Sequence, residues 1–368
     1  MKVALELQPC LGNRSGVGTY TYELAKRLQD GGGMEFAGNV FNFLGRHDNA
    51  ASLDGIQMPI RERRIFPYGV YRRIWDLVPI PYESMFPGAD LSVFFNFVVP
   101  PRVSGKVITT VHDMTFLRFP ETMDAKNLRR IRKGMQYSVE RSDRILTVSE
   151  FSRREIVELL GVDKDRVTVI YNAPSIGTGA VAEQEIQGPY ILYVGTIEPR
   201  KNLTRLIRAF DLLKREQGIP HKLVLAGGKG WNNEEIYKTA SNAEYREEIV
   251  FTGYVDEPRK NSLYKHADVF AFPSLYEGFG IPPLEAMSFD CPVVASRAAS
   301  LPEIVGDAAE PVDPMDERSL AEGIWRVLSD RQYADGLIGK GREQIRKFTW
   351  TASAEKLRAV CAEVLGIG

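Results

Sequence analysis

Short apolar runs alternate with amphipathic helical patterns along most of this chain. The first run, VALELQP, is followed by a glycine-containing turn and by TYTYELAKRLQDGG, whose apolar residues recur with helical spacing. Further apolar runs are ADLSVFFN, GKVITTVHD, DRILTVS and RVTVIYN, and the helical segment EFSRREIVELLG follows the third of them. Buried strands separated by helices are typical of parallel sheets with crossover helices, so this part of the chain predicts an α/β layer.

A second series of the same kind begins with the strand PYILYVGT and continues with the runs KLVLAGG, IVFTGYV, DVFAFPS and PVVAS. The pattern predicts two doubly wound, Rossmann-like domains in series. Ligands of such sheets bind beyond the carboxyl ends of the strands, so we expect the two domains to face a central cleft. The first helix of the second series is predicted to place these apolar residues on one face: Leu203, Leu206, Ile207, Phe210 and Leu213.

The segment between the two series, APSIGTGAVAEQEIQG, has no sustained periodicity and is rich in Gly, Ala and Pro. Such a composition is typical of a linker. The predicted domains are therefore 1–175 and 189–349, with a linker at 176–188 and a final helical segment at 350–368.

The length of 368 residues exceeds the usual limit for one hydrophobic core, which agrees with two domains. The content of 44% hydrophobic and 26% charged residues is that of an ordinary globular protein. The cysteines Cys10, Cys291 and Cys361 lack the spacing of a disulfide framework or a zinc site. The N-terminal apolar run is too short for a secretory signal, and no segment approaches the roughly 18 apolar residues of a membrane span, so we expect a cytoplasmic protein.

Positive charge is concentrated in the first half of the chain. Residues 1–180 carry 24 Lys and Arg against 20 Asp and Glu, whereas the remainder carries 23 against 28. A solvated helix face explains any single basic cluster, but several clusters in one half also favour a peripheral contact with anionic lipid on the inner face of a membrane, or a phosphorylated acceptor. The clusters are Arg61, Arg63 and Arg64; Arg72 and Arg73; and Arg129, Arg130, Arg132 and Lys133.

The stretch FPSLYEGFGIPPLEAMSFDCPVVAS places two glutamates, Glu277 and Glu285, eight residues apart around a loop. A strand is predicted to end before the loop, and Pro282 with Pro283 to begin a helix, because proline in a first helical turn costs no hydrogen bond. The loop amides and the helix N-terminus then offer donors to an oxygen-rich or anionic ligand. A carboxylate accepts hydrogen bonds from vicinal hydroxyls, so one glutamate suits a sugar and the other a ribose.

The alternative is that Glu285 only complements the helix dipole and that Glu277 is a solvated loop charge. Simple packing does not account for the intervening GFGIPPLEA, so we favour ligand binding.

A second element, EPRKN, lies at a strand-to-helix corner, where Arg200 and Lys201 can neutralise a diphosphate. Surface cations are common, so it is the position of Arg200 and Lys201 at a strand-to-helix corner that supports a role in diphosphate binding.

Two further elements lie in the first half. SGVGTY places Gly16 and Gly18 in the first strand-to-helix turn, but it is not a dinucleotide fingerprint, because Thr21 stands where the last glycine would be. The turn is either a structural device or a place where a phosphate or a sugar approaches the backbone. VHD places His112 at the carboxyl end of a strand, facing the expected cleft, although a lone histidine is more often structural.

Taken together, EGFGIPPLEA with its E-x7-E spacing, YVGTIEPRKN, AGGKGW, FTGYV, SGVGTY and VHD resemble the retaining GT-B glycosyltransferases of family 4, also called group 1. The similarity extends over essentially the whole chain and is densest between residues 190 and 304. It implies the GT-B architecture of two Rossmann-like domains. It also implies that the last helix, Trp350 to Gly368, packs on the N-terminal domain.

The resemblance further implies which residues act. Glu285 would bind the ribose of a nucleotide-sugar donor, and Arg200 and Lys201 its diphosphate. Glu277 would bind the transferred sugar and His112 would lie beside the reacting carbon, so His112, Glu277 and Lys201 form the implied catalytic set. The other implied donor-binding residues are Gly16, Val17, Gly18, Tyr254, Gly278, Phe279, Gly280 and Leu284.

The family retains the anomeric configuration without a well-placed nucleophile, and the leaving phosphate assists the acceptor on the same face of the sugar. Catalysis would then rest on neutralising the diphosphate and aligning the acceptor hydroxyl. We expect no cofactor and no metal ion, because two cations serve the diphosphate and DKD at 163–165 is more typical of a solvated turn. Many relatives have arginine at the position of Thr196, which leaves the number of diphosphate cations open.

The combination of GTIEPRKN with FPSLYEGFGIPPLEAM is most similar to mannosyltransferases of bacterial surface-polysaccharide or lipopolysaccharide assembly. This implies GDP-mannose as donor, a glycan or polyprenyl-diphosphate-linked acceptor, and no nucleic-acid partner. Two alternatives remain. The first is another GT-B activity, such as a sugar phosphorylase or a nucleotide-sugar epimerase, and the second is a non-catalytic nucleotide- or carbohydrate-binding module, against which Glu277, Lys201 and His112 argue.

Overall fold

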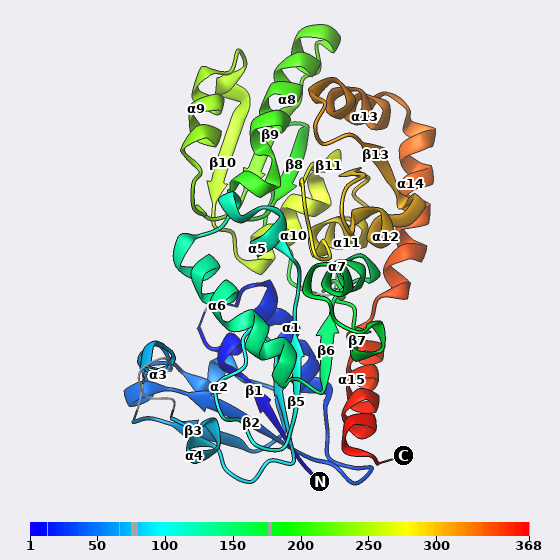
Figure 1. The fold of residues 1–368 in the computed structure, drawn as a ribbon. Helices are drawn as coiled ribbons and strands as arrows, with labels where there is room; N and C mark the ends of the chain where they lie inside the picture. The colour runs from blue at the N-terminus through cyan, green and yellow to red at the C-terminus, as the bar shows by residue number, and fades with distance from the viewer. Residues whose placement is uncertain (13, 66, 75–79, 176–178, 368) are drawn as a thin grey trace. The chain divides into compact units, whose positions relative to one another are not determined.

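A computed structural model describes residues 1–12, 14–65, 67–74, 80–175 and 179–367 (Figure 1). The chain forms two compact units, each built on one parallel sheet. Neither unit is a continuous segment, because the chain passes between them more than once. The first unit comprises Met1–Met114, Lys126–Asn172 and Trp350–Gly368, and the second comprises Thr115–Ala125 and Ala173–Thr349.

The first unit holds a seven-stranded parallel sheet whose strands are almost wholly buried near its centre. Its strands are β1 (Lys2–Glu6), β2 (Glu35–Phe41), β3 (Ile60–Arg63), β4 (Leu91–Phe94), β5 (Lys106–Thr110), β6 (Arg144–Thr147) and β7 (Val167–Val169). In space their order is β3-β2-β1-β4-β5-β6-β7, so the order reverses between β1 and β4. A reversal of this kind creates the crevice in which doubly wound sheets bind ligands.

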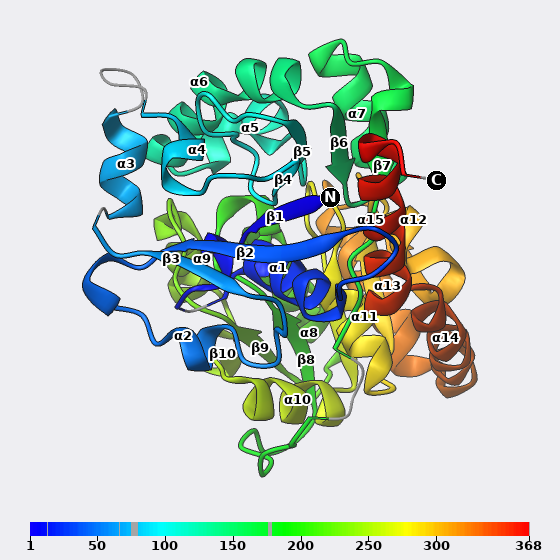
Figure 2. The same cartoon turned by 90° about the horizontal axis from the view of Figure 1, so that it is seen from below.

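Helices cover both faces of the first sheet. They are α1 (Gly16–Arg27), α2 (Asn49–Ser52), α3 (Tyr68–Ile74), α4 (Tyr82–Met85), α6 (Ala125–Arg141), α7 (Glu150–Leu160) and α15 (Trp350–Leu365), with the 3-10 turns η1 (Gln8–Cys10), η2 (Phe43–Gly45) and η4 (Lys164–Arg166). Helices α1 and α15 contact each other on one face, and α6 covers the other (Figure 2). Local sequence sets the helix ends: Ser149 caps α7 by accepting the N–H of Ser152 over 3.0 Å, and Gly161 ends it in the left-handed region.

Helix α15 belongs to the first unit although it follows the second in sequence. Leu357 is fully buried, and the ring of Trp350 lies 6.1 Å from that of Tyr20 on α1. The Ser353 hydroxyl donates to the carbonyl of Tyr171 over 2.7 Å. Apolar burial and specific hydrogen bonds therefore both hold α15 on this unit.

The second unit holds a six-stranded parallel sheet. Its strands are β8 (Tyr190–Val194), β9 (Lys222–Ala226), β10 (Ile249–Gly253), β11 (Val269–Phe272), β12 (Val293–Ser296) and β13 (Ala309–Val312). Their order in space is β10-β9-β8-β11-β12-β13, which reverses between β8 and β11. The central strands β8 and β11 are buried along their whole length, as expected of a sheet covered on both faces.

The helices of the second unit pack in pairs, with α8 against α13 and α10 against α11. The predicted apolar face of α8 is confirmed, because its five residues are all buried. The helices are α5 (Thr115–Arg118), α8 (Leu203–Gln217), α9 (Glu234–Asn242), α10 (Glu257–His266), α11 (Ile281–Ser288), α12 (Leu301–Val305), α13 (Glu317–Ser329) and α14 (Arg331–Gln344), with η3 (Pro120–Thr122), η5 (Pro199–Lys201), η6 (Arg246–Glu248), η7 (Gly306–Ala308) and η8 (Ile345–Lys347).

The predicted α/β class with two Rossmann-like domains is confirmed by these two sheets. One detail differs from the predicted first domain, 1–175, because Thr115–Ala125 groups with the second unit. There the ring of Phe119 lies 5.4 Å from that of Tyr276, and the Trp231 indole donates to the carbonyl of Thr122. Of the predicted linker and final segment, residues 176–178 and 368 lie outside the described residues.

Candidate functional site

The segments after β8 and β11 bring the predicted diphosphate cations and the first glutamate together. These strands are neighbours at the reversal of the second sheet, where open α/β sheets bind ligands. Arg200 and Lys201 lie in η5 after β8, and Glu277 lies in the loop after β11. The N–H of Leu275 donates to the carbonyl of Arg200 over 2.9 Å, which ties the two segments to each other.

Asn202 fixes the position of the two cations. Its backbone φ of 62° lies in the left-handed region, which asparagine tolerates better than most residues. Its side-chain amide donates to the carbonyls of Pro273 over 3.0 Å and of Pro314 over 2.6 Å. The asparagine of EPRKN therefore ends η5 and holds it against the loop after β11.

Glu277 forms ion pairs with both cations. Its Oε1 lies 2.6 Å from Lys201 Nζ, and its Oε2 lies 2.8 Å from Arg200 Nη1. The residue is only 7% exposed. Burial favours a raised pKa for this carboxyl, but the charges and hydrogen bonds of Arg200 and Lys201 outweigh burial and lower the pKa to about 2. Glu277 is therefore ionised at neutral pH.

Arg200 is shared between two carboxylates. Its Nη2 donates to Glu198 Oε1 over 2.7 Å, and its Nη1 also donates to the carbonyl of Tyr276 over 2.6 Å. Glu198 is buried and is absent from the residues predicted from sequence, although it stands two positions before Arg200 in EPRKN. With Glu198 and Glu277 opposite Arg200 and Lys201, the formal charges of the cluster sum to zero.

The loop between Glu277 and α11 has a fixed shape. Gly280 has a φ of 101°, and a β-carbon there would lie 2.6 Å from the Leu301 side chain, so only glycine fits. The Ser300 hydroxyl lies 2.8 Å from the carbonyl oxygen of Glu277 and 2.9 Å from that of Phe279. Phe279 is itself buried. The hydrogen bonds of Ser300 and the close packing of Leu301 against Gly280 therefore fix the loop. The sequence motif identifies neither residue.

Glu285 lies on α11 and is held by two residues of α10. Its Oε1 lies 2.6 Å from Lys260 Nζ, and its Oε2 accepts the Tyr264 hydroxyl over 3.0 Å. Lys260 and Tyr264 are four positions apart and therefore share a helix face. Burial, followed by the charge of Glu285, keeps the pKa of Tyr264 well above its usual value, so the hydroxyl remains a donor. Lys260 adds a third cation beside the E-x7-E glutamates.

The predicted donor-binding residues Leu284 and Tyr254, and the neighbouring motif residue Thr196, differ in how exposed they are to solvent. Leu284 is fully buried, so its side chain belongs to the core. Tyr254, which follows β10, is 74% exposed. Thr196 is exposed as well, and its side chain carries no charge.

The predicted glycine turn forms the first turn of α1 in the first unit. Ser15 caps the helix by accepting the N–H of Gly18 over 3.4 Å. A β-carbon at Gly18 would lie 2.4 Å from the carbonyl oxygen of Pro9, so packing requires this glycine. A β-carbon at Gly16 would meet no atom within 4 Å, so packing does not require glycine there. Val17, between them, is half-buried.

His112 follows β5 in the first unit and is 9% exposed. Its Nε2 lies 2.7 Å from the carbonyl oxygen of Phe95, and because a carbonyl only accepts, Nε2 carries the proton. Burial lowers the pKa of His112 below its usual value, so the ring is neutral at pH 7 and Nδ1 is an acceptor. The rings of Tyr20 and Phe97 flank it at 5.2 and 5.5 Å.

The structure therefore brings Arg200, Lys201 and Glu277 into direct contact, and it gives Glu285 different partners on the helix after the same loop. His112 and the Gly16 turn belong to the first unit, so the predicted catalytic set is divided between the two units. The roles of these residues stay predictions. Gly278 lies in the loop between Glu277 and Gly280.

Within the described residues, no group of three or more His, Cys, Asp or Glu side chains is arranged to hold a metal ion. Cys10, Cys291 and Cys361 are buried and form no disulfide. None of the helices in the described part of the chain has both the length and the apolar character needed to cross a bilayer.

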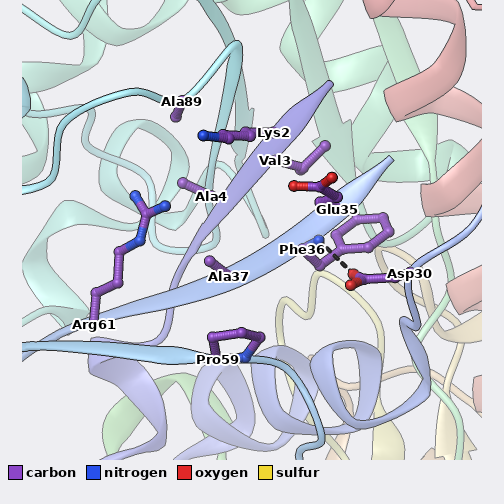
Figure 3. Close-up of a pocket in the computed structure, with 10 residues that line it drawn as sticks. All are labelled: Lys2, Val3, Ala4, Asp30, Glu35, Phe36, Ala37, Pro59, Arg61 and Ala89. Carbon is purple, nitrogen blue, oxygen red and sulfur yellow. Dashed lines mark hydrogen bonds between the residues drawn. The ribbon is translucent and has the colours of Figure 1, made fainter. Parts of the chain in front are cut away.

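A hollow of about 140 Å³ lies at the amino ends of the strands of the first sheet, away from their carboxyl ends (Figure 3). Residues at the amino ends of β1 and β2 line it, among them Lys2, Glu35 and Phe36, together with Asp30 and Arg61. The Asp30 carboxylate accepts the backbone N–H of Phe36 over 2.7 Å. Because open α/β sheets bind ligands at the carboxyl ends of their strands, we do not place the donor or the acceptor in this hollow.

Comparison with known sequences identifies relatives of both units. The family model described as glycosyl transferases group 1 matches residues 182–344, and the model described as glycosyltransferase family 4 matches residues 14–174. The chain is 31% identical to O-antigen chain mannosyltransferase B of Escherichia coli, over 95% of this chain and 96% of that protein. It is also 31% identical to the serotype-specific mannosyltransferase WbdA of Escherichia coli, over 69% of this chain but only 33% of WbdA, so it spans about a third of that protein.

Solved structures show the same fold at lower sequence identity. Anabaena Alr3699/HepE, in complex with UDP and glucose, superposes with a TM-score of 0.75 at 18% identity, covering 99% of this chain and all of that one. This likeness concerns the fold alone. Two family models that together cover most of the sequence, and a relative matched over nearly its whole length, show that the chain belongs to glycosyltransferase family 4 and is a glycosyltransferase with the GT-B fold.

Proposed function

We propose that this enzyme transfers mannose from GDP-mannose, with retention of configuration, to a glycan or polyprenyl-diphosphate-linked acceptor of a bacterial surface polysaccharide. The observation that carries the proposal is the similarity to O-antigen chain mannosyltransferase B along 95% of this chain. The ion-paired cluster at the reversal of the second sheet supports it, because it holds both an acceptor for sugar hydroxyls and cations for a diphosphate.

Lys201 links the sugar and the diphosphate in this proposal. An ammonium group has three N–H donors, and Lys201 uses one of them for Glu277 over 2.6 Å. It can therefore hold Glu277 and bind a phosphate oxygen at the same time. The remaining lone pairs of Glu277 then accept hydrogen bonds from the sugar hydroxyls, so a correctly placed diphosphate also places the sugar.

Glu285 suits the ribose. Each of its carboxylate oxygens accepts one hydrogen bond from α10 and has a further lone pair for a ribose hydroxyl. Lys260 and Tyr264 fix the orientation of the carboxylate before the donor arrives, which lowers the entropic cost of binding.

In the proposed reaction the bond between the sugar C1 and the diphosphate oxygen breaks while the acceptor oxygen bonds to C1 on the same face. The acceptor proton passes to the leaving phosphate oxygen. Arg200 and Lys201 stabilise the negative charge that builds on that oxygen, and no cofactor takes part. His112, neutral and with Nδ1 as an acceptor, would hold a hydroxyl of the sugar beside the reacting carbon.

The direct test is transfer from a panel of nucleotide sugars to a mannose-terminated acceptor, followed by NMR of the product. We expect an α-mannoside from GDP-mannose, which itself is α-linked. Hydrolysis or epimerisation without a glycoside would refute transfer, a β-product would refute retention, and transfer only from another nucleotide sugar would refute the donor.

Thermal stability provides a second measurement that needs no acceptor. A ligand at 100 times its Kd stabilises the folded state by about 2.7 kcal/mol, so GDP should raise the Tm by several degrees. UDP at the same concentration should raise it less. Equal shifts with both nucleotides would contradict the choice of base.

A further inference from the structure

Glu6 lies at the carboxyl end of β1, where the strand order of the first sheet reverses. In the sheet register it stands beside Asn39 of β2 and Phe94 of β4. The residue is 5% exposed, and its Oε1 has no hydrogen-bond partner within the described residues. Buried polar atoms without a partner are rare in folded proteins, and this one lies where a doubly wound sheet binds its ligand.

Several charged and titratable groups surround this carboxyl. Burial raises the pKa of Glu6 to about 8, against smaller lowering effects of the Gln8 backbone N–H and of two arginines. Burial also raises the pKa of the neighbouring cysteine and tyrosines, so near pH 7 these groups are uncharged. The charged and titratable groups that interact electrostatically with Glu6 are Cys10 on η1, Tyr68 and Arg72 on α3, Tyr82 on α4 and Arg130 on α6.

Arg72 and Arg130 supply the positive charge of the cluster. Burial and the nearby Arg72 lower the pKa of Arg130 to about 10, which still leaves it protonated at neutral pH. Arg130 Nη2 donates to Asn127 Oδ1 over 2.7 Å, and the Arg72 guanidinium lies 5.3 Å from the centre of the Tyr68 ring. Within the described residues, neither arginine forms an ion pair with a carboxylate.

With the buried Glu6 carboxyl protonated, the cluster therefore holds one hydroxyl donor and the two positive charges of the half-buried arginines. A neutral sugar leaves both charges unbalanced. A phosphate or diphosphate group balances them and accepts hydrogen bonds from both guanidinium groups, which match phosphate oxygens in geometry. The carboxyl O–H then donates to the same anion, as a protonated acid does when its site keeps it neutral.

We propose that Glu6, Arg72 and Arg130 form a subsite on the first unit for a phosphate or diphosphate group of the acceptor. The proposal rests on the glycosyl transfer proposed above and specifies the chemistry of the acceptor. The anion has two sources, a lipid-linked diphosphate and a phosphorylated sugar. Both present the same oxygens to the arginines.

The first experiment measures anion binding without any transfer. Inorganic pyrophosphate is titrated by calorimetry while saturating nucleoside diphosphate occupies the donor site. We expect Arg72→Gln and Arg130→Gln to bind pyrophosphate about tenfold more weakly or worse, the usual loss for a charged hydrogen bond. Arg129→Gln is the matched control, because Arg129 is an exposed arginine on the same helix, and it should stay within about twofold of the native protein. Equal affinities in all four proteins, or no binding to the native one, overturn the proposal.

The second experiment compares acceptors. One glycan is offered as a short-chain prenyl diphosphate, as a sugar 1-phosphate and as a neutral alkyl glycoside. We expect Arg130→Gln to raise the KM for whichever anionic acceptor the enzyme uses, with kcat and the donor KM little changed. The anionic acceptor whose KM rises most in Arg130→Gln identifies the source of the anion. An equal rise in the KM for the neutral glycoside overturns the proposal. If no acceptor is glycosylated, the proposed transfer fails while calorimetry still decides the anion subsite.

The third experiment tests the protonated carboxyl. Pyrophosphate affinity in the native protein should fall as the pH rises through about 8, because ionised Glu6 repels the anion. Glu6→Gln keeps a neutral donor, so it should bind at pH 7 nearly as well and lose this additional fall. The titration of pyrophosphate itself is common to both proteins and cancels in the comparison. Identical pH profiles overturn the assigned role of Glu6.

Discussion

Replacing Glu277 by glutamine should destabilise the second unit and strengthen nucleotide binding in the same protein. The substitution keeps the size of the side chain and removes its charge. The ion pairs lower the pKa of Glu277 from 4.5 to about 2, and a shift of that size corresponds to about 3 kcal/mol of stability at neutral pH. Because the pKa is lowered in the folded protein, this stabilisation is present above about pH 4.5 and is lost as the pH falls through about 2. We therefore expect the free energy of unfolding at pH 7 to fall by about 3 kcal/mol.

Nucleotide affinity should change in the opposite direction. In the native protein Glu198 and Glu277 balance Arg200 and Lys201, so the ligand-free cluster offers a diphosphate no net positive charge. The glutamine leaves one positive charge in excess, which adds about 1 to 2 kcal/mol of attraction for the diphosphate. Nucleoside diphosphate should therefore bind roughly 5- to 30-fold more tightly. Turnover should fall by about 100-fold, because the sugar loses the acceptor that aligns it.

Three measurements on one preparation decide the matter: urea unfolding, calorimetry with nucleoside diphosphate, and initial transfer rates at saturating donor. Glu343→Gln is the control, because Glu343 is exposed on α14, and it should leave all three quantities unchanged. Weaker nucleotide binding together with normal turnover would refute the reasoning, since Glu277 would then act on the nucleotide and not on the sugar.

Three further outcomes are expected. Lys201→Ala should weaken nucleoside diphosphate and nucleotide sugar alike, by about 1.5 to 3 kcal/mol in calorimetry, because both ligands carry the diphosphate; unchanged affinities would remove Lys201 from the site. Turnover should be the same with and without EDTA, because cationic side chains meet the diphosphate charge, and activity lost to EDTA but restored by Mg²⁺ or Mn²⁺ would contradict this. Leu357→Ala should lower the free energy of unfolding by about 2 to 5 kcal/mol, because Leu357 is fully buried in α15, whereas the exposed Lys356→Ala should have little effect in the same urea titration; equal effects would contradict the packing described for α15.

Strands β8 to β12 of the second sheet and the donor loop are predictable from sequence because their local patterns are strong, whereas β13 is not predicted. Continuous apolar runs mark β8, β9, β11 and β12, and Pro282 and Pro283 mark the start of α11. The alternation also identifies β1 and β4 to β7 of the first sheet. The sequence analysis identifies neither β2 nor β3. The sequence of β3, IRER, carries three charged residues in four, because an edge strand is half-exposed and needs no apolar pattern.

The partners of the site residues are less predictable, because they come from distant parts of the chain. Lys260 and Tyr264 reach Glu285 from 25 and 21 residues away, and no local motif joins them to it. Glu198 stands inside a recognised motif, yet its ion pair with Arg200 depends on how η5 folds. A signal for Glu6 did exist, because it is the one charged residue in the largely apolar run VALELQP.

The position of α15 determines which of the two units can complete its core first during synthesis. Domains generally fold as they emerge from the ribosome, N-terminal part first. Here the first unit lacks Trp350, Leu357 and their neighbours until all of the second unit has been made. Tyr20 and the rest of the α1 surface that α15 covers are therefore exposed while some 180 further residues are translated. The second unit needs nothing from beyond Thr349, so during synthesis it is the later unit that completes its core first.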